Sequence, residues 1–246
     1  MIVLSGCAAT HSLSRSTASD RPTEASLHGF LDRWDLWNSY AAHMKLKLSV
    51  NDSTFKARGH ILYLVGERYE VGFAKPYNQL LGNLYISPDQ VVYWGANSSP
   101  AVYTANDTIC LTDIFQTAAP NWNPRDLLPF PVAGRSAGFQ VDSLDSGKDL
   151  LVHGHSDDAN YSLTITHRSG SVSTERIKRN GYDPVIKYYS RYQWINGWPL
   201  ARRIVCQDTS GSVTLIWYLS DIALDAAPQI LGDAIGNEST TGTSHE

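Results

Sequence analysis

The sequence predicts a mainly β domain (α+β) in which about 12 antiparallel strands curl, with a few helices beside them. Three observations predict it. Short runs of alternating apolar and polar residues are separated by tight turns such as Asn180-Gly181 and Asn196-Gly197. An amphipathic helix pattern occurs near the N-terminus, and a proline-rich helical pattern interrupts the strands midway. At 246 residues, of which 42% are hydrophobic, the chain can bury the core of one such domain.

The first residues match a lipobox, the recognition pattern of the lipoprotein signal peptidase. Leu4 is aliphatic, Ser5 and Gly6 are small, and Cys7 is the residue that would be lipidated. The pattern resembles that of bacterial lipoproteins. It predicts residues 1–6 as a residual signal peptide and 7–21 as a lipidated, flexible tether. Only six residues precede Cys7, whereas an export signal has roughly 15–30. Either the start codon is placed late or the signal is broken; the alternative is a chance match.

The domain itself is predicted to span residues 22–225 and to begin with a helix. Pro22 suits the first turn of that helix. A bulky apolar face follows at helical spacing: Leu27, Phe30, Leu31, Trp34, Trp37 and Ala41. Such a face needs an apolar surface to cover, so the helix is expected to close the mouth of the curled sheet. Residues 226–246 are small and polar and are expected to be a disordered tail.

Strands are predicted to follow the helix in quick succession. Met44, Leu46, Leu48 and Val50 alternate with polar residues, which is the period of a strand with one buried face. Gly59, in the middle of the next run, indicates a bulge or a bend. Further strands are expected at 55–65, 69–73, 80–86, 91–94, 101–105, 139–144, 149–154, 161–167, 173–178, 185–195, 200–208 and 213–222. Between the two halves, residues 107–118 and 123–128 are predicted to form short helices.

The charge pattern argues against nucleic acid as a partner. The formal net charge is −4, and no basic stripe is visible along the sequence, whereas phosphate binding needs clustered Lys and Arg. No apolar run reaches the roughly 18 residues of a transmembrane helix, so the lipid on Cys7 would be the membrane link. Cys110 and Cys206 are either a disulfide, formed in an oxidising envelope, or two small buried residues on separate strands.

Two weak patterns concern metal binding and catalysis. His153 and His155 share one face of a strand, but the sequence places no third metal ligand, so a solvated strand end is the favoured interpretation. Residues 134–138 match G-x-S-x-G, yet the strand-turn-helix context of a serine esterase is missing, so an esterase is a remote alternative. The sequence therefore predicts a protein that is not an enzyme and that has no metal site and no cofactor.

The order of elements resembles the LolA/LolB superfamily of periplasmic lipoprotein carriers and outer-membrane lipoprotein receptors. The resemblance covers residues 24–225 and rests on three passages. Residues 69–77 match a strand that ends in a proline-containing loop, 103–131 match a helix followed by a proline-rich stretch, and 190–217 match the closing strands. The resemblance implies an incomplete antiparallel β-barrel of about 11–12 strands, closed by a helical lid, whose hollow takes acyl chains. A lipidated Cys7 favours the receptor branch.

In that branch, an apolar residue on a protruding loop delivers cargo to the membrane. The matching loop here contains Pro76, Tyr77, Leu80 and Leu81. Tyr77 is nearest to the apolar position, although tyrosine is less apolar than the family's residue. Leu80 and Leu81 either substitute for it or begin the next strand.

Same-face spacing selects the candidate cavity residues. They are Trp34 and Trp37 from the lid, with Leu46, Leu48, Ile61, Tyr63, Val71 and Phe73 from strands. A register error of one residue would exchange Ile61 and Tyr63 for Leu62 and Leu64. These residues could line a hollow or fill a core.

The resemblance therefore predicts an envelope lipoprotein at the outer membrane, facing the periplasm, that binds acyl chains or lipoproteins and takes part in their transport or insertion. The rival is a structural or assembly lipoprotein with a filled barrel that docks another envelope protein.

Overall fold

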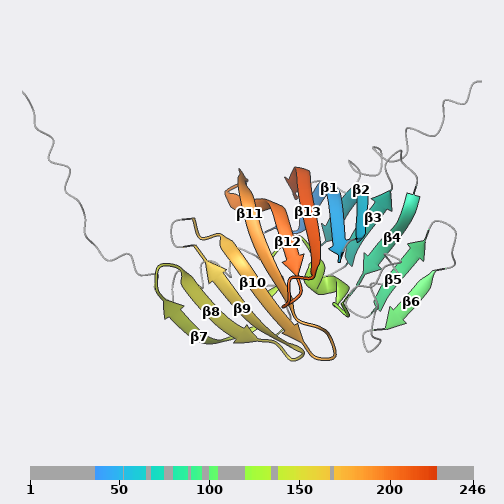
Figure 1. Cartoon of the computed structure of the whole chain (residues 1–246). Coiled ribbons are helices and arrows are strands. Elements are labelled where there is room, and N and C mark those ends of the chain that lie inside the picture. Colours follow the sequence, from blue (N-terminus) through green and yellow to red (C-terminus); the bar gives the residue numbers. More distant parts are fainter. Residues whose placement is uncertain are drawn as a thin grey trace, which may run out of the picture.

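A computed structural model describes residues 37–51, 53–64, 68–74, 80–87, 90–95, 100–104, 120–133, 138–166 and 169–225. These residues form one antiparallel sheet of 13 strands and one short 3-10 helix (Figure 1). The strands are β1 (Ser39–Val50), β2 (Ser53–Leu64), β3 (Arg68–Ala74), β4 (Leu80–Ile86), β5 (Gln90–Gly95), β6 (Ala101–Thr104), β7 (Gln140–Ser146), β8 (Leu150–His155), β9 (Ala159–Ile165), β10 (Val172–Arg179), β11 (Val185–Ile195), β12 (Trp198–Gln207) and β13 (Val213–Leu224). The 3-10 helix is η1 (Pro124–Leu127).

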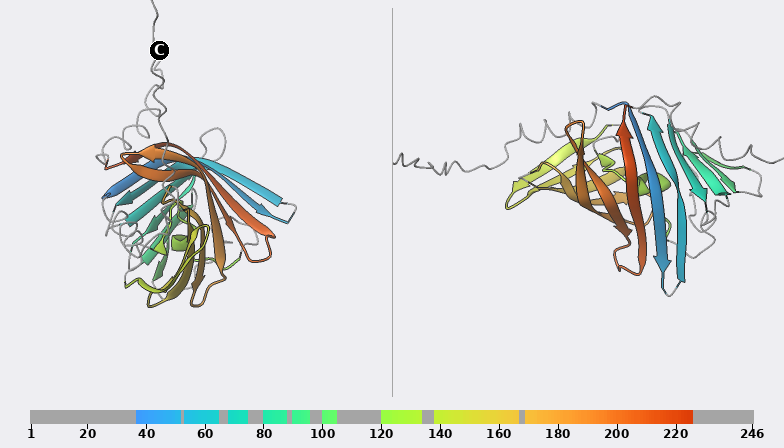
Figure 2. Two further views of the ribbon diagram at one scale, coloured as in Figure 1. Left: turned by 90° about the vertical axis from the view of Figure 1, so that its left-hand side faces the viewer. Right: turned by 90° about the horizontal axis from the view of Figure 1, so that it is seen from above.

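The sheet consists of two meanders joined at its centre. Its order is β6-β5-β4-β3-β2-β1-β13-β12-β11-β10-β9-β8-β7, so β1 and β13 pair although they lie at opposite ends of the domain sequence. Strands β6 and β7 are the two edges, and they do not pair with each other. The sheet curls strongly without closing (Figure 2). The predicted incomplete antiparallel barrel is confirmed, with 13 strands where about 12 were expected.

The alternating pattern of β1 is confirmed and defines the two faces of the sheet. Met44, Leu46, Leu48 and Val50 are buried, whereas the lysines between them are exposed or half-buried. Burying a side chain of this size stabilises the fold by about 1.5–3 kcal/mol. β1 pairs along its whole length with β2 and along most of it with β13, so this central strand satisfies its backbone hydrogen bonds on both sides.

The helix predicted to extend as far as Ala41 is wrong at its C-terminal end. Trp37 precedes β1, and Ala41 lies inside that strand, opposite Leu62 on one side and Ala223 on the other. Pairing with two neighbouring strands outweighs the local helical spacing of Trp37 and Ala41. The rest of the predicted helix, including Trp34, lies outside the described residues, as do Cys7, the tether and the C-terminal tail.

Gly59 does not form the bulge or bend that its position in the sequence indicates. The register of β1 and β2 runs without a shift from Ser39–Leu64 to Val50–Ser53. Instead, Gly59 permits a close backbone approach: a Cβ atom placed there would lie 1.8 Å from the carbonyl oxygen of Gly72 on β3. The neighbouring position is equally crowded, because a Cβ on Gly72 would lie 2.3 Å from the His60 ring.

The proline-rich segment 120–133 enters the curve of the sheet. It contains η1, which confirms the helix expected at 123–128. The side chain of Asn123 accepts a hydrogen bond from the backbone N–H of Arg125 at 2.9 Å and so caps the first turn. Figure 2 shows this segment inside the curl, where its apolar residues join the core. The helix predicted at 107–118 lies outside the described residues.

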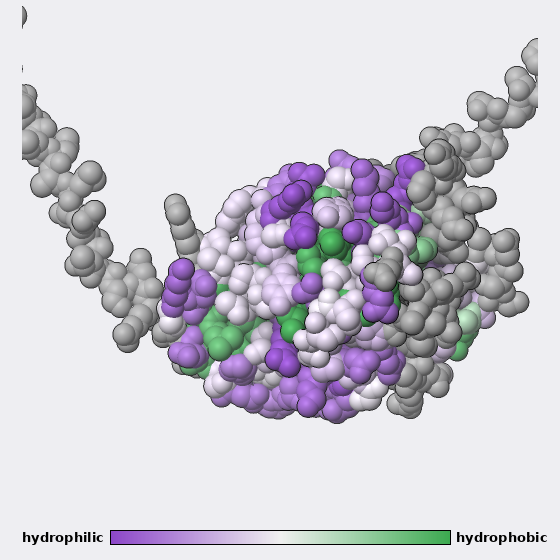
Figure 3. All heavy atoms as spheres, viewed as in Figure 1, coloured by the Kyte–Doolittle hydropathy of each residue, from purple (hydrophilic) through white to green (hydrophobic). Residues whose placement is uncertain are grey.

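The outer face of the sheet carries a feature that the sequence analysis missed. Lys45 of β1 is opposite Arg58 of β2, and Lys47 is opposite Lys56. The basic stripe judged absent from the sequence is therefore present in the structure, because the register brings separated residues together. On the face seen in Figure 3, hydrophobic surface gathers over the β7–β8 end of the sheet, where Val141 and Leu144 are exposed, and smaller hydrophobic areas lie near the middle. No helix among the described residues is long and apolar enough to cross a membrane.

We predict that Gly59→Ala destabilises the domain strongly, because the new methyl group would overlap a backbone oxygen that cannot rotate away. The free energy of unfolding in urea should fall by about 1–3 kcal/mol or more. Gly147→Ala is the matched control: it lies in the β7–β8 turn, where a Cβ meets its nearest atom at 3.9 Å. Equal stabilities of the two variants would show that β2 and β3 do not approach each other as described.

Candidate functional site on the concave face

The predicted cavity residues lie together on the inner, concave face. Their side chains are buried, and all belong to one hydrophobic cluster: Trp37, Leu46, Leu48, Ile61, Tyr63, Val71 and Phe73. Leu62 and Leu64 are only half-buried, so the structure chooses Ile61 and Tyr63 for the inner face of β2. The placement agrees with the spacing; the role of these residues toward a ligand stays a prediction.

Phe130 occupies the centre of this face. Its ring centroid lies 5.4 Å from that of Tyr63, 5.5 Å from Tyr40 and 5.7 Å from Trp37. The contacts with Trp37 and Tyr40 are edge-to-face, an arrangement in which each aromatic pair adds about 0.5–1.5 kcal/mol beyond its buried area. Tyr69 also stacks on Phe130, at 5.9 Å. A phenyl ring therefore stands where the resemblance places a hollow.

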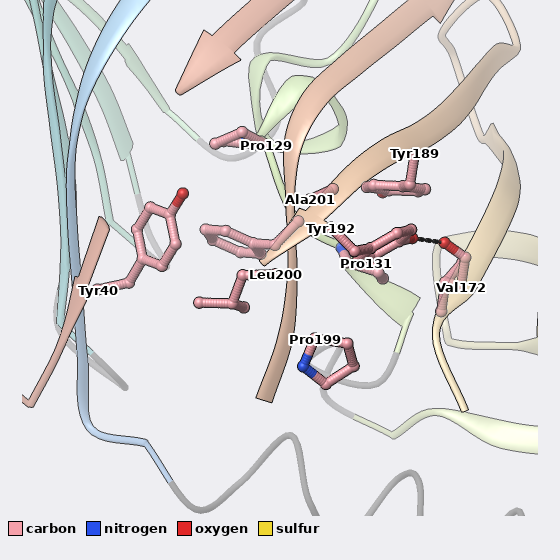
Figure 4. A pocket seen from close by; sticks show the side chains of 10 residues that line it. Tyr40, Pro129, Pro131, Val172, Tyr189, Tyr192, Pro199, Leu200 and Ala201 are labelled. Atoms are coloured by element: carbon pink, nitrogen blue, oxygen red, sulfur yellow. Dashed lines mark hydrogen bonds between the residues drawn. The ribbon is translucent and has the colours of Figure 1, made fainter. Parts of the chain in front are cut away.

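Little free space remains beside Phe130. A cavity of about 10 Å³ is lined by Phe130 together with residues of strands β11 and β12 (Figure 4). This is room for about one water molecule. Its lining is aromatic and apolar, with Tyr40, Tyr189 and Leu200 among the side chains that face it. Within the described residues, the concave face next to Phe130 is filled.

A buried carboxylate holds the backbone that follows Phe130. Glu175 of β10 accepts hydrogen bonds from the backbone N–H groups of Val132 at 2.8 Å and Ala133 at 2.9 Å. Its other oxygen accepts a hydrogen bond from the Tyr189 hydroxyl at 2.7 Å and forms an ion pair with Lys187 at 2.9 Å. Glu175 and Lys187 are both fully buried.

Lys187 completes this cluster from the neighbouring strand. It stands directly opposite Glu175 in the β10–β11 register and donates a hydrogen bond to the carbonyl oxygen of Phe130 at 2.8 Å. The charge of each residue is thus compensated by its partner, and the remaining polar atoms bind the backbone of the segment. Such a pair is costly to break, because removing one partner leaves an uncompensated buried charge. We call Glu175, Lys187 and Tyr189 the polar latch.

A second ion pair holds the helical part of the segment. Arg179 donates two hydrogen bonds to the carboxylate of Asp126, at 2.7 and 2.9 Å, and also contacts Asp158. Burial raises the pKa of Asp126, and the hydrogen bonds from Arg179 oppose that shift. The paired geometry is the bidentate form in which arginine binds carboxylates most strongly.

The start of the segment is tied to both halves of the sheet. Asn121 donates its backbone N–H to Asp183 at 2.9 Å, and Asp183 returns a backbone bond to Asn121 at 2.9 Å, both at the β10–β11 turn. On the other side, Arg125 donates to the carbonyl oxygen of Ser87 at 2.7 Å, next to β4. The segment therefore bridges the two meanders across the inside of the curl.

The other predicted site residues have different outcomes. Leu80 and Leu81 are the first residues of β4, as the interpretation that they begin the next strand expects. Pro76 and Tyr77 lie outside the described residues. Cys206 is a free cysteine, fully buried, and burial raises its pKa to about 12. Cys110 lies outside the described residues; the free thiol of Cys206 matches the alternative interpretation, a small buried residue, rather than the disulfide.

The two histidines of the possible metal site make separate contacts. His153 contacts the Ser162 hydroxyl at 2.7 Å, and His155 contacts Asp142 at 2.7 Å, which are separate contacts on neighbouring strands. No group of three potential metal ligands gathers among the described residues. In the G-x-S-x-G match, residues 134–137 lie outside the described residues.

Sequence reasoning missed the residues that fix the segment. Glu175 and Lys187 occupy inward positions on their strands, in step with Ile177 and Val185. A charged residue at an inward position is expensive unless it is paired, so their placement was a usable signal. The identity of their backbone partners, by contrast, depends on contacts more than 40 residues apart along the chain.

Comparison with known proteins identifies the fold. No protein-family model matches the chain, and no curated protein matches it. Solved structures do: a LolA superfamily protein from Nitrosomonas europaea aligns with a TM-score of 0.56 at 13% identity, covering 83% of this chain and 96% of the other. The chain has the fold of the LolA superfamily.

Two further structures share this LolA-like fold. A domain described as that of an outer membrane lipoprotein-sorting protein, from Vibrio parahaemolyticus, aligns with a TM-score of 0.62 at 10% identity, covering 86% of this chain and 96% of that domain. A DUF1329 family protein from Desulfovibrio piger aligns with a TM-score of 0.59 at 8% identity, covering 84% and 95%. The match extends over nearly the whole of each neighbour, so the likeness is to the fold as a whole.

We predict that Glu175→Gln destabilises the LolA-like domain by about 3–5 kcal/mol, because it leaves Lys187 as a buried charge without its carboxylate. Urea unfolding followed by tryptophan fluorescence would measure the change. The matched control is Glu70→Gln on β3, whose carboxylate is partly exposed and lies 3.9 Å from His60. That change should cost at most about 1 kcal/mol. A loss in Glu175→Gln no larger than in the control would contradict the latch.

Proposed function

We propose that this chain is a bacterial envelope lipoprotein, anchored through Cys7, that binds acyl chains of lipids or lipoproteins on the concave face of its sheet. The observation that carries the proposal is the apolar concave face on which the side chain of Phe130 packs among the aromatic rings. In this proposal Phe130 is a movable cover, and the acyl chain takes its place among Trp37, Tyr63 and the neighbouring side chains. The role is binding rather than catalysis.

The contacts of the segment favour motion of the side chain over motion of the backbone. Lys187 holds the carbonyl oxygen of Phe130, and Glu175 holds the next two available N–H groups, at Val132 and Ala133. The phenyl ring of Phe130 packs against the rings of Trp37, Tyr40 and Tyr63. Rotation of the ring would join its volume to the adjoining cavity without breaking the latch.

The energies of the two states are comparable. Removing the packing of a buried Phe costs about 3–5 kcal/mol, while each buried CH₂ of an acyl chain contributes about 0.8 kcal/mol. About five methylene groups therefore offset the displaced ring, and a longer chain binds with net gain. Short fatty acids should consequently bind much more weakly than long ones.

The fold and the lipobox support an envelope role. The neighbours in fold include a LolA superfamily protein and a lipoprotein-sorting domain, and the lipobox at Cys7 is typical of lipoproteins. We therefore propose the outer membrane, on its periplasmic side, as the location of the protein, and transport or insertion of lipoproteins as its process. Its partners are then acyl chains, lipoproteins and the membrane that holds Cys7.

A specific observation favours the rival function. The cavity beside Phe130 holds only about 10 Å³, and two buried ion pairs fix the segment that carries the ring. A permanently filled core of this kind suits a structural or assembly lipoprotein that docks another envelope protein through its rim. The two functions differ in one property, namely whether Phe130 yields to an acyl chain.

Displacement of a fluorescent long-chain fatty acid by unlabelled fatty acids tests the proposal. We expect saturable binding to the unmodified chain and tighter binding to Phe130→Ala, because that variant no longer has to displace the ring. Phe130→Ala should also lower the free energy of unfolding by about 3–5 kcal/mol, so stability is measured beside binding. Phe139→Ala is the matched control, since Phe139 packs on Tyr161 away from Phe130 and should leave affinity unchanged.

Two results would decide against acyl binding. No saturable binding by either the unmodified chain or a folded Phe130→Ala would favour the rival with a filled core. Binding that is the same in Phe130→Ala and Phe139→Ala would show that the acyl chain binds elsewhere.

A further inference from the structure

The outer face of the central strands carries a row of cations. Arg203 of β12 is opposite Tyr218 of β13, Tyr218 is opposite Lys45 of β1, and Lys45 is opposite Arg58 of β2. One step along the strands, Lys47 is opposite Lys56. Neighbouring strands lie about 4.8 Å apart, so the row is roughly 15 Å wide. We call Lys45, Lys47, Lys56, Arg58 and Arg203 the basic row.

Among the described residues, no acidic side chain forms an ion pair with this row. Strands β1, β2, β12 and β13 together contain a single acidic residue, Asp221, near the end of β13. None of the ion pairs found among the described residues includes a member of the basic row. The nearest acid on the outer face of β3, Glu70, contacts His60 instead. The concentration of positive charge contrasts with the net charge of −4 of the whole chain.

The arrangement is unfavourable for the isolated protein. Like charges directly opposite each other on neighbouring strands destabilise a sheet, and here two such pairs stand side by side. Lys45, Lys56 and Arg58 are exposed, so their stems add little to the core. An anionic partner that lies across the row would offset the repulsion between these cations. Binding such a partner would explain why like charges stand opposite each other here.

Going beyond acyl binding on the concave face, we propose that the basic row docks the protein on the anionic headgroups of a membrane. The row lies on the convex side, on the strands at the middle of the sheet order, where a flat surface makes first contact (Figure 2). A free phosphate ion would need a concave site, whereas an extended, outward array of cations matches a layer of headgroups.

Exposed tyrosines support this choice of partner. Tyr218 is 37% exposed within the row, with the Arg203 guanidinium 6.0 Å from its ring centroid, and Tyr188 on β11 is 42% exposed. Tyrosine is enriched at the headgroup level of membranes, because its ring and hydroxyl suit that boundary. The pattern of cations with interleaved tyrosines is therefore that of an interfacial surface.

The path of the chain is compatible with this orientation. β1 begins next to the end of β13, where Asn38 donates its backbone N–H to Asp225 at 2.6 Å. Some 30 residues separate Cys7 from β1, enough to span tens of ångströms when extended. A lipid on Cys7 therefore leaves the orientation of the domain free, and the basic row would set it, with the convex face toward the bilayer.

The test is flotation of the full chain with lipid vesicles. The chain carries Cys7→Ser, so that no lipid anchor contributes to binding. We expect binding to vesicles of phosphatidylcholine with phosphatidylglycerol, weak binding to phosphatidylcholine alone, and loss of binding as salt is raised. Lys45→Gln/Arg58→Gln should weaken binding to the anionic vesicles roughly tenfold or more. The control Lys148→Gln/Arg191→Gln makes the same change of charge at exposed residues outside the row and should have little effect.

Each contrary result overturns the proposal. These are no preference for anionic vesicles, an equal loss of affinity in the two double variants, or equal binding to a short DNA duplex, which would make the row a general polyanion site. Circular dichroism confirms that the variants fold. Fatty-acid displacement on the same samples separates the two proposals, since the basic row is on the opposite face from Phe130 and its variants should keep their acyl affinity.

Discussion

The carboxylate of Glu175 is the constraint on which the inside of this protein depends. A curled 13-stranded sheet leaves a deep apolar concavity, and the segment 120–133 can remain there only if its backbone groups find partners. Glu175 supplies them from the sheet, accepting two N–H groups of the segment, and Lys187 balances its charge while binding the carbonyl of Phe130. The position of Phe130, and with it the shape of the concave face, follows from these contacts. In the same way, Arg179 on β10 binds the carboxylate of Asp126 and so holds the helical turn η1 against the sheet.

This arrangement divides the inner face into a fixed part and a part that can yield. The backbone of the segment is held by buried charges, whose separation is expensive. The ring of Phe130 is held by packing, whose loss an incoming apolar chain can replace. Without a ligand, the ring of Phe130 would fill such a site. Rotation of this one side chain would open the site to an acyl chain. The same geometry, with a ring that never yields, would be a solid core, so the distinction between a binding protein and a structural one depends on Phe130.

Much of the fold follows from local patterns, because β-strands with one buried face repeat every two residues. Met44 to Val50, and the choice of Ile61 over Leu62, were predictable in this way. Helical spacing predicts Trp37 and Ala41 on one helix face, but Ala41 pairs with both β2 and β13, and Trp37 lies just before that strand. Gly59 was taken for a bulge, although its reason is the oxygen of Gly72, which no pattern within β2 reveals. The polar latch and the basic row cannot be read from local patterns either. The contact of Glu175 with Val132, and the position of Lys45 opposite Arg58 and Tyr218, depend on how the strands are paired.

Native-state hydrogen exchange at the amides of Val132 and Ala133 tests the central claim most directly. Both N–H groups are donated to a buried carboxylate and lie in a segment without regular strand pairing. If the latch holds the segment, these two amides exchange as slowly as those of the central strands β1 and β13, and exchange quickens sharply in Glu175→Gln. Exchange as fast as in the exposed turn between β12 and β13, in the unmodified protein, would contradict the account.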